Sequence, residues 1–209
     1  MKKLLHIAVS PRGEKSRTLK IARAFLEEFR ATHPGIEIDT LNLFEEEIPE
    51  ILEPVTRGKY ALMSEGELLN ETREAWKGIE QQIERFLAAD LYLLSTPMWN
   101  FSIPYKLKHY IDAIVQPKYL FQYTEEGVEG LAKNKRMIVI STRGGDYSEN
   151  SPFHEYDQLE PYLKTVFGFV GITDITFLNA QPMDALGTEI MLEKVEASKK
   201  RGREIARGL

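Results

Sequence analysis

The fold of this chain is decided by a stretch near its N-terminus, "LLHIAVSPRGEKSRTLKIARAFLEEF" (residues 4–29). It begins with a continuously apolar run, Leu4–Val9, which is typical of a buried β-strand. A short proline-containing turn follows, and apolar residues then recur at helical spacing from Leu19 to Phe29. Because a buried strand leads directly into an amphipathic helix, the sequence predicts an α/β fold.

Four more strand-like segments follow along the chain. Several of these segments are apolar on both faces, as expected of parallel strands that are covered by helices on both sides. The segments between them carry apolar residues at helical spacing, and no internal repeat or linker interrupts the pattern. We therefore predict a single domain over residues 1–209, a flavodoxin-like, doubly wound, five-stranded parallel sheet with helices on both faces. The predicted strands are Leu4–Val9, Ile36–Leu41, Leu91–Ser95, Arg136–Thr142 and Thr173–Leu178.

One segment does not follow the alternation of strands and helices. Residues Asn42–Gly66 are acidic and carry Pro49, Pro54 and Gly58. Proline and glycine interrupt regular structure. We interpret this segment as an excursion after the second strand that serves as a lid or as an arm in a dimer.

Composition excludes several classes of protein. The chain has a formal net charge of -5, so it offers no basic footprint for nucleic acid. It has no cysteine, which excludes disulfides and thiolate catalysis and fits a reducing compartment, and its four histidines share no metal-ligand spacing. No apolar stretch is long enough to cross a bilayer, and the N-terminal apolar run is too short for a signal peptide. We therefore expect a cytoplasmic protein with no metal, no nucleic-acid partner and no membrane partner.

The loop after the first strand is a candidate phosphate site. A triphosphate-binding loop needs a glycine directly before Lys-Ser/Thr, and a dinucleotide fingerprint needs three glycines, whereas Gly13 is the only glycine here. The N-terminus of a helix nevertheless offers free N–H groups to a phosphate. The hydroxyls of Ser10, Ser16 and Thr18 can add donors. The alternative is that Ser16 is only the N-cap of the helix.

Two further loops should meet this one, because ligands of open α/β sheets bind at the carboxyl ends of the strands. The loop after the third strand, "PMWNFSIP" (residues 97–104), is aromatic and stiffened by proline. The loop after the fourth, Thr142–Gly145, has two glycines that permit close backbone approach to a ligand. Together they suit a planar ring system with a phosphate tail. The alternative is that Trp99 and Phe101 plug the core or contact another subunit.

On these motifs the chain resembles the FMN-dependent NADH-azoreductase family, flavodoxin-like homodimers related to the NAD(P)H:quinone reductases. The matching segments run in the family's order over nearly the whole chain. They are "SPRGEKSRT", "PMWNFSIPYKLKHYIDAI", "FQYTEEGVEGL", "TRGGDY" and "FGFVGITDI". Two departures concern the acceptor pocket: "QPKYLFQYT" lacks a glycine shortly before the Phe-x-Tyr pair, and "DYSENSPFHEYDQLE" is longer than usual.

The resemblance implies bound FMN, NADH or NADPH as electron donor, and ping-pong hydride transfer through flavin N5 to a quinone or azo acceptor. It also implies that Phe121 and Tyr123 form the substrate pocket over the flavin of the partner subunit in a homodimer. The implied flavin contacts are Ser10, Ser16, Arg17 and Thr18 at the phosphate, Met98, Trp99, Asn100 and Phe101 beside the isoalloxazine, and Thr142, Arg143, Gly144 and Gly145 at its pyrimidine edge.

This scheme requires no acid–base side chain, although Tyr147 and His154 are candidates for a proton donor. A backbone N–H of the aromatic loop is expected near flavin N5. The replacement Asn100→Pro, which removes such a group, is expected to slow flavin reduction before it affects folding. Two other functions stay open, an electron carrier without a nicotinamide site and a signalling domain without flavin.

Overall fold

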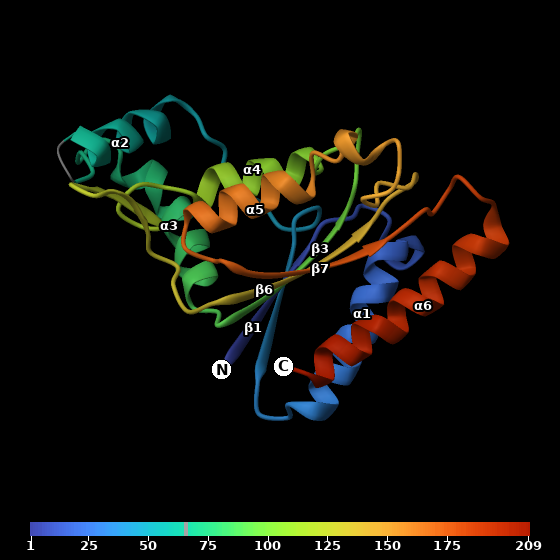
Figure 1. Ribbon diagram of the computed structural model, residues 1–209. Coiled ribbons are helices and arrows are strands. Elements are labelled where there is room, and N and C mark those ends of the chain that lie inside the picture. The colour runs from blue at the N-terminus through green and yellow to red at the C-terminus, as the bar shows by residue number, and fades with distance from the viewer. Residues whose placement is uncertain (65–66) are drawn as a thin grey trace.

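The computed structural model describes residues 1–64 and 67–209 and confirms the α/β prediction. Its main sheet has five parallel strands in the order β2-β1-β3-β6-β7 (Figure 1). All five predicted strands are present in this sheet. They are β1 (Lys3–Ala8), β2 (Glu37–Asn42), β3 (Leu91–Pro97), β6 (Arg136–Thr142) and β7 (Asp174–Ala180).

Helices cover both faces of the sheet. Figure 1 shows α1 and α6 together on one face and α3, α4 and α5 on the other. Strand side chains alternate between the two layers, so Leu5 and Ile7 of β1 belong to one core while Leu4 belongs to the other. Burial on both faces explains the continuous apolar runs of the central strands. The helices are α1 (Arg17–Thr32), α3 (Arg73–Leu87), α4 (Tyr105–Ile114), α5 (Glu160–Phe169) and α6 (Thr188–Arg207).

The direction of the chain connections changes between β1 and β3. The connection after β1 leads to α1 on one face, whereas the connection after β3 leads to α4 on the opposite face. Two loops that diverge from neighbouring strands leave a crevice at the carboxyl edge of the sheet. This crevice is where the fold places a ligand site.

The interpretation of Asn42–Gly66 as an excursion is wrong for its second half, which contains the helix α2 (Glu53–Ser64). Pro54 occupies the first turn, where its missing N–H removes no helical hydrogen bond. The predicted segment also includes residues 65–66, which lie outside the described residues. Residues 43–52 form the irregular connection from β2 to this helix.

Packing on Trp76 explains why this segment is helical. The indole Nε1 of Trp76 donates a hydrogen bond of 3.1 Å to the carbonyl oxygen of Val55. Gly58 lies directly against the same ring, because a Cβ built there would come within 2.2 Å of Nε1. The glycine therefore allows close packing here instead of ending the helix.

A small antiparallel hairpin follows α4 and was not predicted. It consists of β4 (Phe121–Thr124) and β5 (Gly127–Gly130). Gly130 allows the hairpin to approach the end of α5, since a Cβ there would lie 2.3 Å from the nitrogen of Gly171. Two short 3-10 turns complete the described structure, η1 (Gly13–Lys15) and η2 (His154–Tyr156). Among the helices of residues 1–64 and 67–209, we find none long and apolar enough to span a membrane.

Candidate functional site

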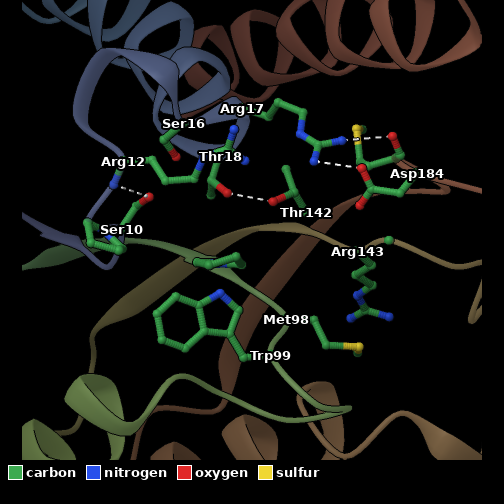
Figure 2. Close-up of a pocket in the computed structure, with 14 residues that line it drawn as sticks. Ser10, Arg12, Ser16, Arg17, Thr18, Met98, Trp99, Thr142, Arg143 and Asp184 are labelled. Atoms are coloured by element: carbon green, nitrogen blue, oxygen red, sulfur yellow. Dashed lines mark hydrogen bonds and ion pairs between the residues drawn. The ribbon is translucent and has the colours of Figure 1, made fainter. Parts of the chain in front are cut away.

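A cavity of about 240 Å³ lies at the carboxyl edge of the sheet, where four loops converge (Figure 2). The loops after β1, β3 and β6 were predicted to meet, and the structure brings them together. The loop after β7 is a fourth wall that was not predicted. The lining residues are Ser10, Pro11, Arg12, Ser16, Arg17, Thr18, Pro97, Met98, Trp99, Thr142, Arg143, Gly144, Met183 and Asp184.

The first wall of the cavity is the N-terminus of α1. Ser16 is the N-cap, and its buried Oγ accepts a hydrogen bond of 3.3 Å from the N–H of Leu19. The capping role considered for Ser16 is therefore confirmed, and its O–H proton remains for another acceptor. In the described part of the chain, the N–H groups of Arg17 and Thr18 donate no hydrogen bond. Free N–H groups and the positive end of a helix make this wall a seat for an anion.

Thr18 also joins this wall to the loop after β6. Its Oγ1 lies 2.6 Å from Oγ1 of Thr142, and both side chains are buried. Only one proton lies between the two oxygens of this pair, so the second hydroxyl can donate elsewhere. Figure 2 shows this pair at the centre of the polar side of the cavity.

The charged side chains of this wall differ in what they contact. The guanidinium of Arg17 donates to the carbonyl of Met183 at 2.7 Å and to the carboxylate of Asp184 at 2.8 Å. These bonds tie α1 to the loop after β7 and partly neutralise the charge of Arg17, so its predicted contact with a phosphate stays a prediction. Arg12 also lines the cavity and forms no ion pair with the described residues.

Sequence reasoning missed several lining residues, although signals for them exist. Arg12 stands inside the quoted "SPRG" turn, directly before the helix. Met183 and Asp184 follow the fifth strand at the same carboxyl edge as the other loops. The rule that ligands collect at this edge would have included that loop.

The loop after β3 forms a tight two-residue turn. Trp99 and Ser102 exchange backbone hydrogen bonds of 2.9 and 3.0 Å, and the residues between them, Asn100 and Phe101, have φ values of 46° and 71°. Two positive φ values define a type I′ turn, and this conformation costs a bulky residue about 1–3 kcal/mol. Proline cannot adopt a positive φ. The expectation that Asn100→Pro would spare folding is therefore wrong.

Residues of this turn divide between the cavity and its outer side. Met98 and Trp99 line the cavity, and Figure 2 shows them facing the polar wall. Asn100 and Phe101 are not among the lining residues, and Phe101 is half exposed. The ring centroid of Trp99 lies 6.0 Å from that of Phe44, which extends the aromatic wall. Phe44 was missed because it lies in the segment interpreted as an excursion.

Arg143 in the loop after β6 lines the cavity, and several of its polar groups already have partners. Its N–H donates to the carbonyl of Ala180 at 3.1 Å, so this N–H is not free for a ligand. Its guanidinium is buried and donates to Asp157 at 2.6 Å and to Ser141 at 3.1 Å. Its Nη2 is buried and has no hydrogen-bond partner among the described residues, and the role of Arg143 at a pyrimidine edge stays a prediction.

Gly144 and Gly145 are the free donors of this loop. In residues 1–64 and 67–209 neither N–H finds a hydrogen-bond acceptor. Gly144 lines the cavity, and a Cβ there would lie 3.1 Å from Oδ2 of Asp184. Gly145 lies outside the lining set, against the ring of Tyr147.

The remaining predicted residues lie outside the cavity. His154 is exposed, its Nδ1 lies 3.1 Å from the carbonyl oxygen of Tyr147, and both line a separate hollow. Phe121 is buried against Phe169 with ring centroids 4.8 Å apart, whereas Tyr123 is exposed on the hairpin. Roles for these residues in proton donation and in a substrate pocket stay predictions.

The fold and the cavity define a flavodoxin-like protein. Its cavity lies at the edge of the parallel sheet where the connections after β1 and β3 diverge, and it places an anion-binding helix N-terminus beside an aromatic wall. A family model described as flavodoxin-like fold matches residues 2–204. Among curated proteins, the FMN-dependent NADH:quinone oxidoreductase of Nitratidesulfovibrio vulgaris (strain DP4) is 35% identical over 207 residues, which cover 99% of both chains. The chain belongs to this family of oxidoreductases.

Solved structures agree with this assignment. An azoreductase from Bacillus anthracis str. Sterne superposes with a TM-score of 0.90 at 27% identity, covering 100% of both chains. An FMN-dependent NADH-azoreductase from Bacillus anthracis str. Ames Ancestor, solved in complex with FMN, has a TM-score of 0.84 at 30% identity and covers 99% of this chain and 100% of that one. The predicted resemblance is confirmed.

Proposed function

We propose that this protein is an FMN-dependent NADH oxidoreductase that reduces quinones, azo compounds or both. The proposal depends on the cavity between the loops after β1 and β3. Free N–H groups at the start of α1 and an aromatic wall that includes Trp99 both line this cavity. The names of the relatives supply FMN, NADH and the quinone and azo acceptors.

The residues present fit FMN. The unpaired N–H groups of Arg17 and Thr18, with the hydroxyl of Ser16, would hold the phosphate. Met98 and Trp99 would flank the ring system, as their place on the cavity wall suggests. When bound, FMN supplies the redox chemistry, taking a hydride from NADH and passing electrons to the acceptor.

The free N–H of Gly144 has a separate task in this proposal. Gly144 lines the cavity in the loop after β6. A fixed backbone donor stabilises negative charge on a bound ring system without any rearrangement. The strained turn at Asn100 and Phe101 fixes the positions of two more N–H groups. Within the described chain neither donates a hydrogen bond, so both remain available to a bound ring system.

We propose further that the protein acts as a homodimer in which the hairpin of one protomer covers the cavity of its partner. Support comes from exposed apolar side chains at the cavity rim and on the hairpin, including Trp99, Tyr105 and Tyr123. Large exposed apolar groups favour contact with another surface. The absence of cysteine supports a cytoplasmic location.

The test is anaerobic addition of NADH to the purified yellow protein. An NADH oxidoreductase bleaches, and a quinone then restores the colour. An electron carrier without a nicotinamide site stays yellow with NADH but bleaches with dithionite, which would overturn the proposal. A colourless protein that takes up no FMN would instead favour a domain without flavin. NADPH tested in parallel identifies the preferred donor.

A further inference from the structure

The helices α1 and α6 lie against each other along only part of their length. They approach closely at Gly202, where a built Cβ would lie 3.7 Å from Phe25, and an ion pair of 2.6 Å joins Arg207 to Glu28 near their C-terminal ends. Toward their first turns, Figure 1 shows the two helices diverging. A hollow of about 390 Å³ lies there, between the start of α6 and the segment that leads into α1, and its size suits a small molecule.

The rim of this hollow carries a surplus of positive charge. Five cationic side chains line it, and two of them, Arg17 and Lys199, form ion pairs of 2.8 and 2.7 Å with carboxylates that also line it. The other three are exposed and form no ion pair with the residues that the structure describes. Because the whole chain has a formal net charge of -5, this local surplus favours an anion at the hollow. The three unpaired cations are Arg12, Lys15 and Lys20.

The floor of the hollow is apolar and aliphatic. Met183 and Val195 are buried there, and Met191 and Leu192 lie beside them in the first turns of α6. Leu192 is 56% exposed, so most of its side chain is not used by the core of the protein. Among the described residues no aromatic side chain lines this hollow. A planar base would therefore find no ring to stack on, whereas a hydrocarbon chain would find a surface of its own kind.

The hollow borders the candidate flavin cavity but is distinct from it. The ion pair between Arg17 and Asp184, which Figure 2 shows, lines both spaces and so stands at their boundary. Ser16 and Thr18 of the anion seat, like the aromatic wall, line the cavity alone. A ligand in the hollow therefore leaves the place proposed for FMN free.

We propose that this hollow binds aliphatic phosphomonoesters, with the phosphate among the three unpaired cations and the alkyl chain on the apolar floor. A phosphomonoester carries between one and a half and two negative charges at neutral pH, which suits several cations better than the single charge of a carboxylate. Each methylene group that reaches the floor should strengthen binding about fourfold. This site is additional to the proposed oxidoreductase function and does not depend on it.

The test is calorimetric titration of the FMN-saturated protein, in which the anion seat is already filled. The probes are inorganic phosphate, butyl phosphate and octyl phosphate, the last below its micellar concentration. We expect octyl phosphate to bind at least tenfold more tightly than butyl phosphate, because its additional methylene groups reach the floor.

Variants locate the bound probe. Lys15 and Lys20 do not line the flavin cavity, so the double variant Lys15→Gln/Lys20→Gln should weaken octyl phosphate binding at least tenfold through the hollow alone. Leu192→Asn should reduce the advantage of octyl over butyl phosphate about fivefold. Lys200→Gln is the matched control, because it removes an exposed cation of α6 that does not line the hollow and should retain wild-type affinity.

Several results would overturn this site. Equal affinities for the three phosphates would show a contact made by charge alone, and equal weakening by Lys200→Gln and the double variant would show an effect of overall charge. Binding to phosphatidylcholine vesicles that contain phosphatidate, without binding to monomeric octyl phosphate, would assign the hollow to a membrane surface instead. A protein that takes up no FMN would contradict the proposed function, and the same variants titrated without FMN would still decide on the hollow.

Discussion

At the scale of single residues, Ser16 combines two tasks at the start of α1. Its Oγ caps the helix by accepting from Leu19, and its proton remains available to an anion. We predict that Ser16→Ala lowers the free energy of unfolding of the apoprotein by about 1 kcal/mol. It should also weaken FMN binding by about 1–3 kcal/mol. Flavin fluorescence titration and urea unfolding measure the two effects.

Ser16→Asp separates these tasks. An aspartate also caps a helix, so the apoprotein should keep its stability. Its negative charge repels a phosphate, so FMN binding should be weaker than in Ser16→Ala. Thr32→Ala, at the opposite end of α1, is the matched control for loss of a hydroxyl. If Ser16→Ala binds FMN as tightly as wild type, Ser16 acts only as a cap.

The turn at Asn100 makes a second prediction at this scale. Asn100→Gly suits a φ of 46° and keeps the N–H, so folding and flavin reduction by NADH should both be retained. Asn100→Pro forces a negative φ and should lower the free energy of unfolding by about 1–3 kcal/mol or more. Chemical unfolding of the two variants checks this. A proline variant with wild-type stability would show that the turn accepts a different conformation.

At the scale of elements, the docking of α2 depends on Gly58. Gly58→Ala improves intrinsic helix propensity but places a Cβ within 2.2 Å of the buried ring of Trp76. We predict a net loss of about 1–3 kcal/mol in the free energy of unfolding, because an overpacked core must shift. Gly168→Ala in α5 is the control, since nothing lies within 4 Å of its Cβ, and it should stabilise by up to about 1 kcal/mol. Urea unfolding followed by tryptophan emission measures both variants, and equal stabilisation of the two would contradict the packing argument.

His6 lies in β1, beside β3, and makes the stability of the folded protein depend on pH. Its Nε2 lies 3.0 Å from Oγ of Ser95, and burial, with a smaller effect from the charge of Arg30, lowers the pKa of His6 to about 4. The unfolded chain takes up this proton near pH 6.5, whereas the folded protein does so only near pH 4, so stability falls as the pH drops through this window.

We predict that proton uptake by His6 in the unfolded chain lowers the free energy of unfolding by about 2 kcal/mol between pH 7 and pH 5. His6→Gln has no such proton to bind, so its stability should fall correspondingly less over that range. Urea unfolding of wild type and His6→Gln at both pH values measures the difference. His154→Gln, on the exposed segment 146–157, serves as the control and should follow wild type. Identical pH profiles of wild type and His6→Gln would refute a buried neutral imidazole.

At the scale of the whole molecule, the proposed dimer predicts complementation between two defective variants. Ser16→Asp impairs the anion seat, and Tyr123→Ala removes the exposed aromatic ring of the hairpin. A mixed dimer contains one site in which an intact seat meets an intact hairpin from the other protomer. Co-refolding equal amounts should therefore restore about a quarter of the wild-type sites, by random pairing around a two-fold axis. Quinone reduction measures the recovery, and a mixture no better than its components would place the complete site within one protomer.

The α/β architecture could be predicted from local patterns because the central strands are buried on both faces. Such strands appear as uninterrupted apolar runs, as Leu91–Ser95 does, and they need no knowledge of their neighbours. The helix α2 could not be predicted in this way. Pro54 and Gly58 weaken its local signal, and the contact that holds it involves Trp76, which lies in the following helix. The hairpin at Phe121 was missed for a similar reason, since its strands are short and pack on the end of α5.

The sequence by itself determined the class of fold and the three loops that had to meet, because strand periodicity and parallel connections place those loops at one edge. Only the tertiary structure decided which atoms in those loops remain free. Arg17 binds Met183, 166 positions away, and the N–H of Arg143 is taken by Ala180. Such hydrogen bonds form only when distant segments pack together, so no local pattern in the sequence can show whether a donor is already used.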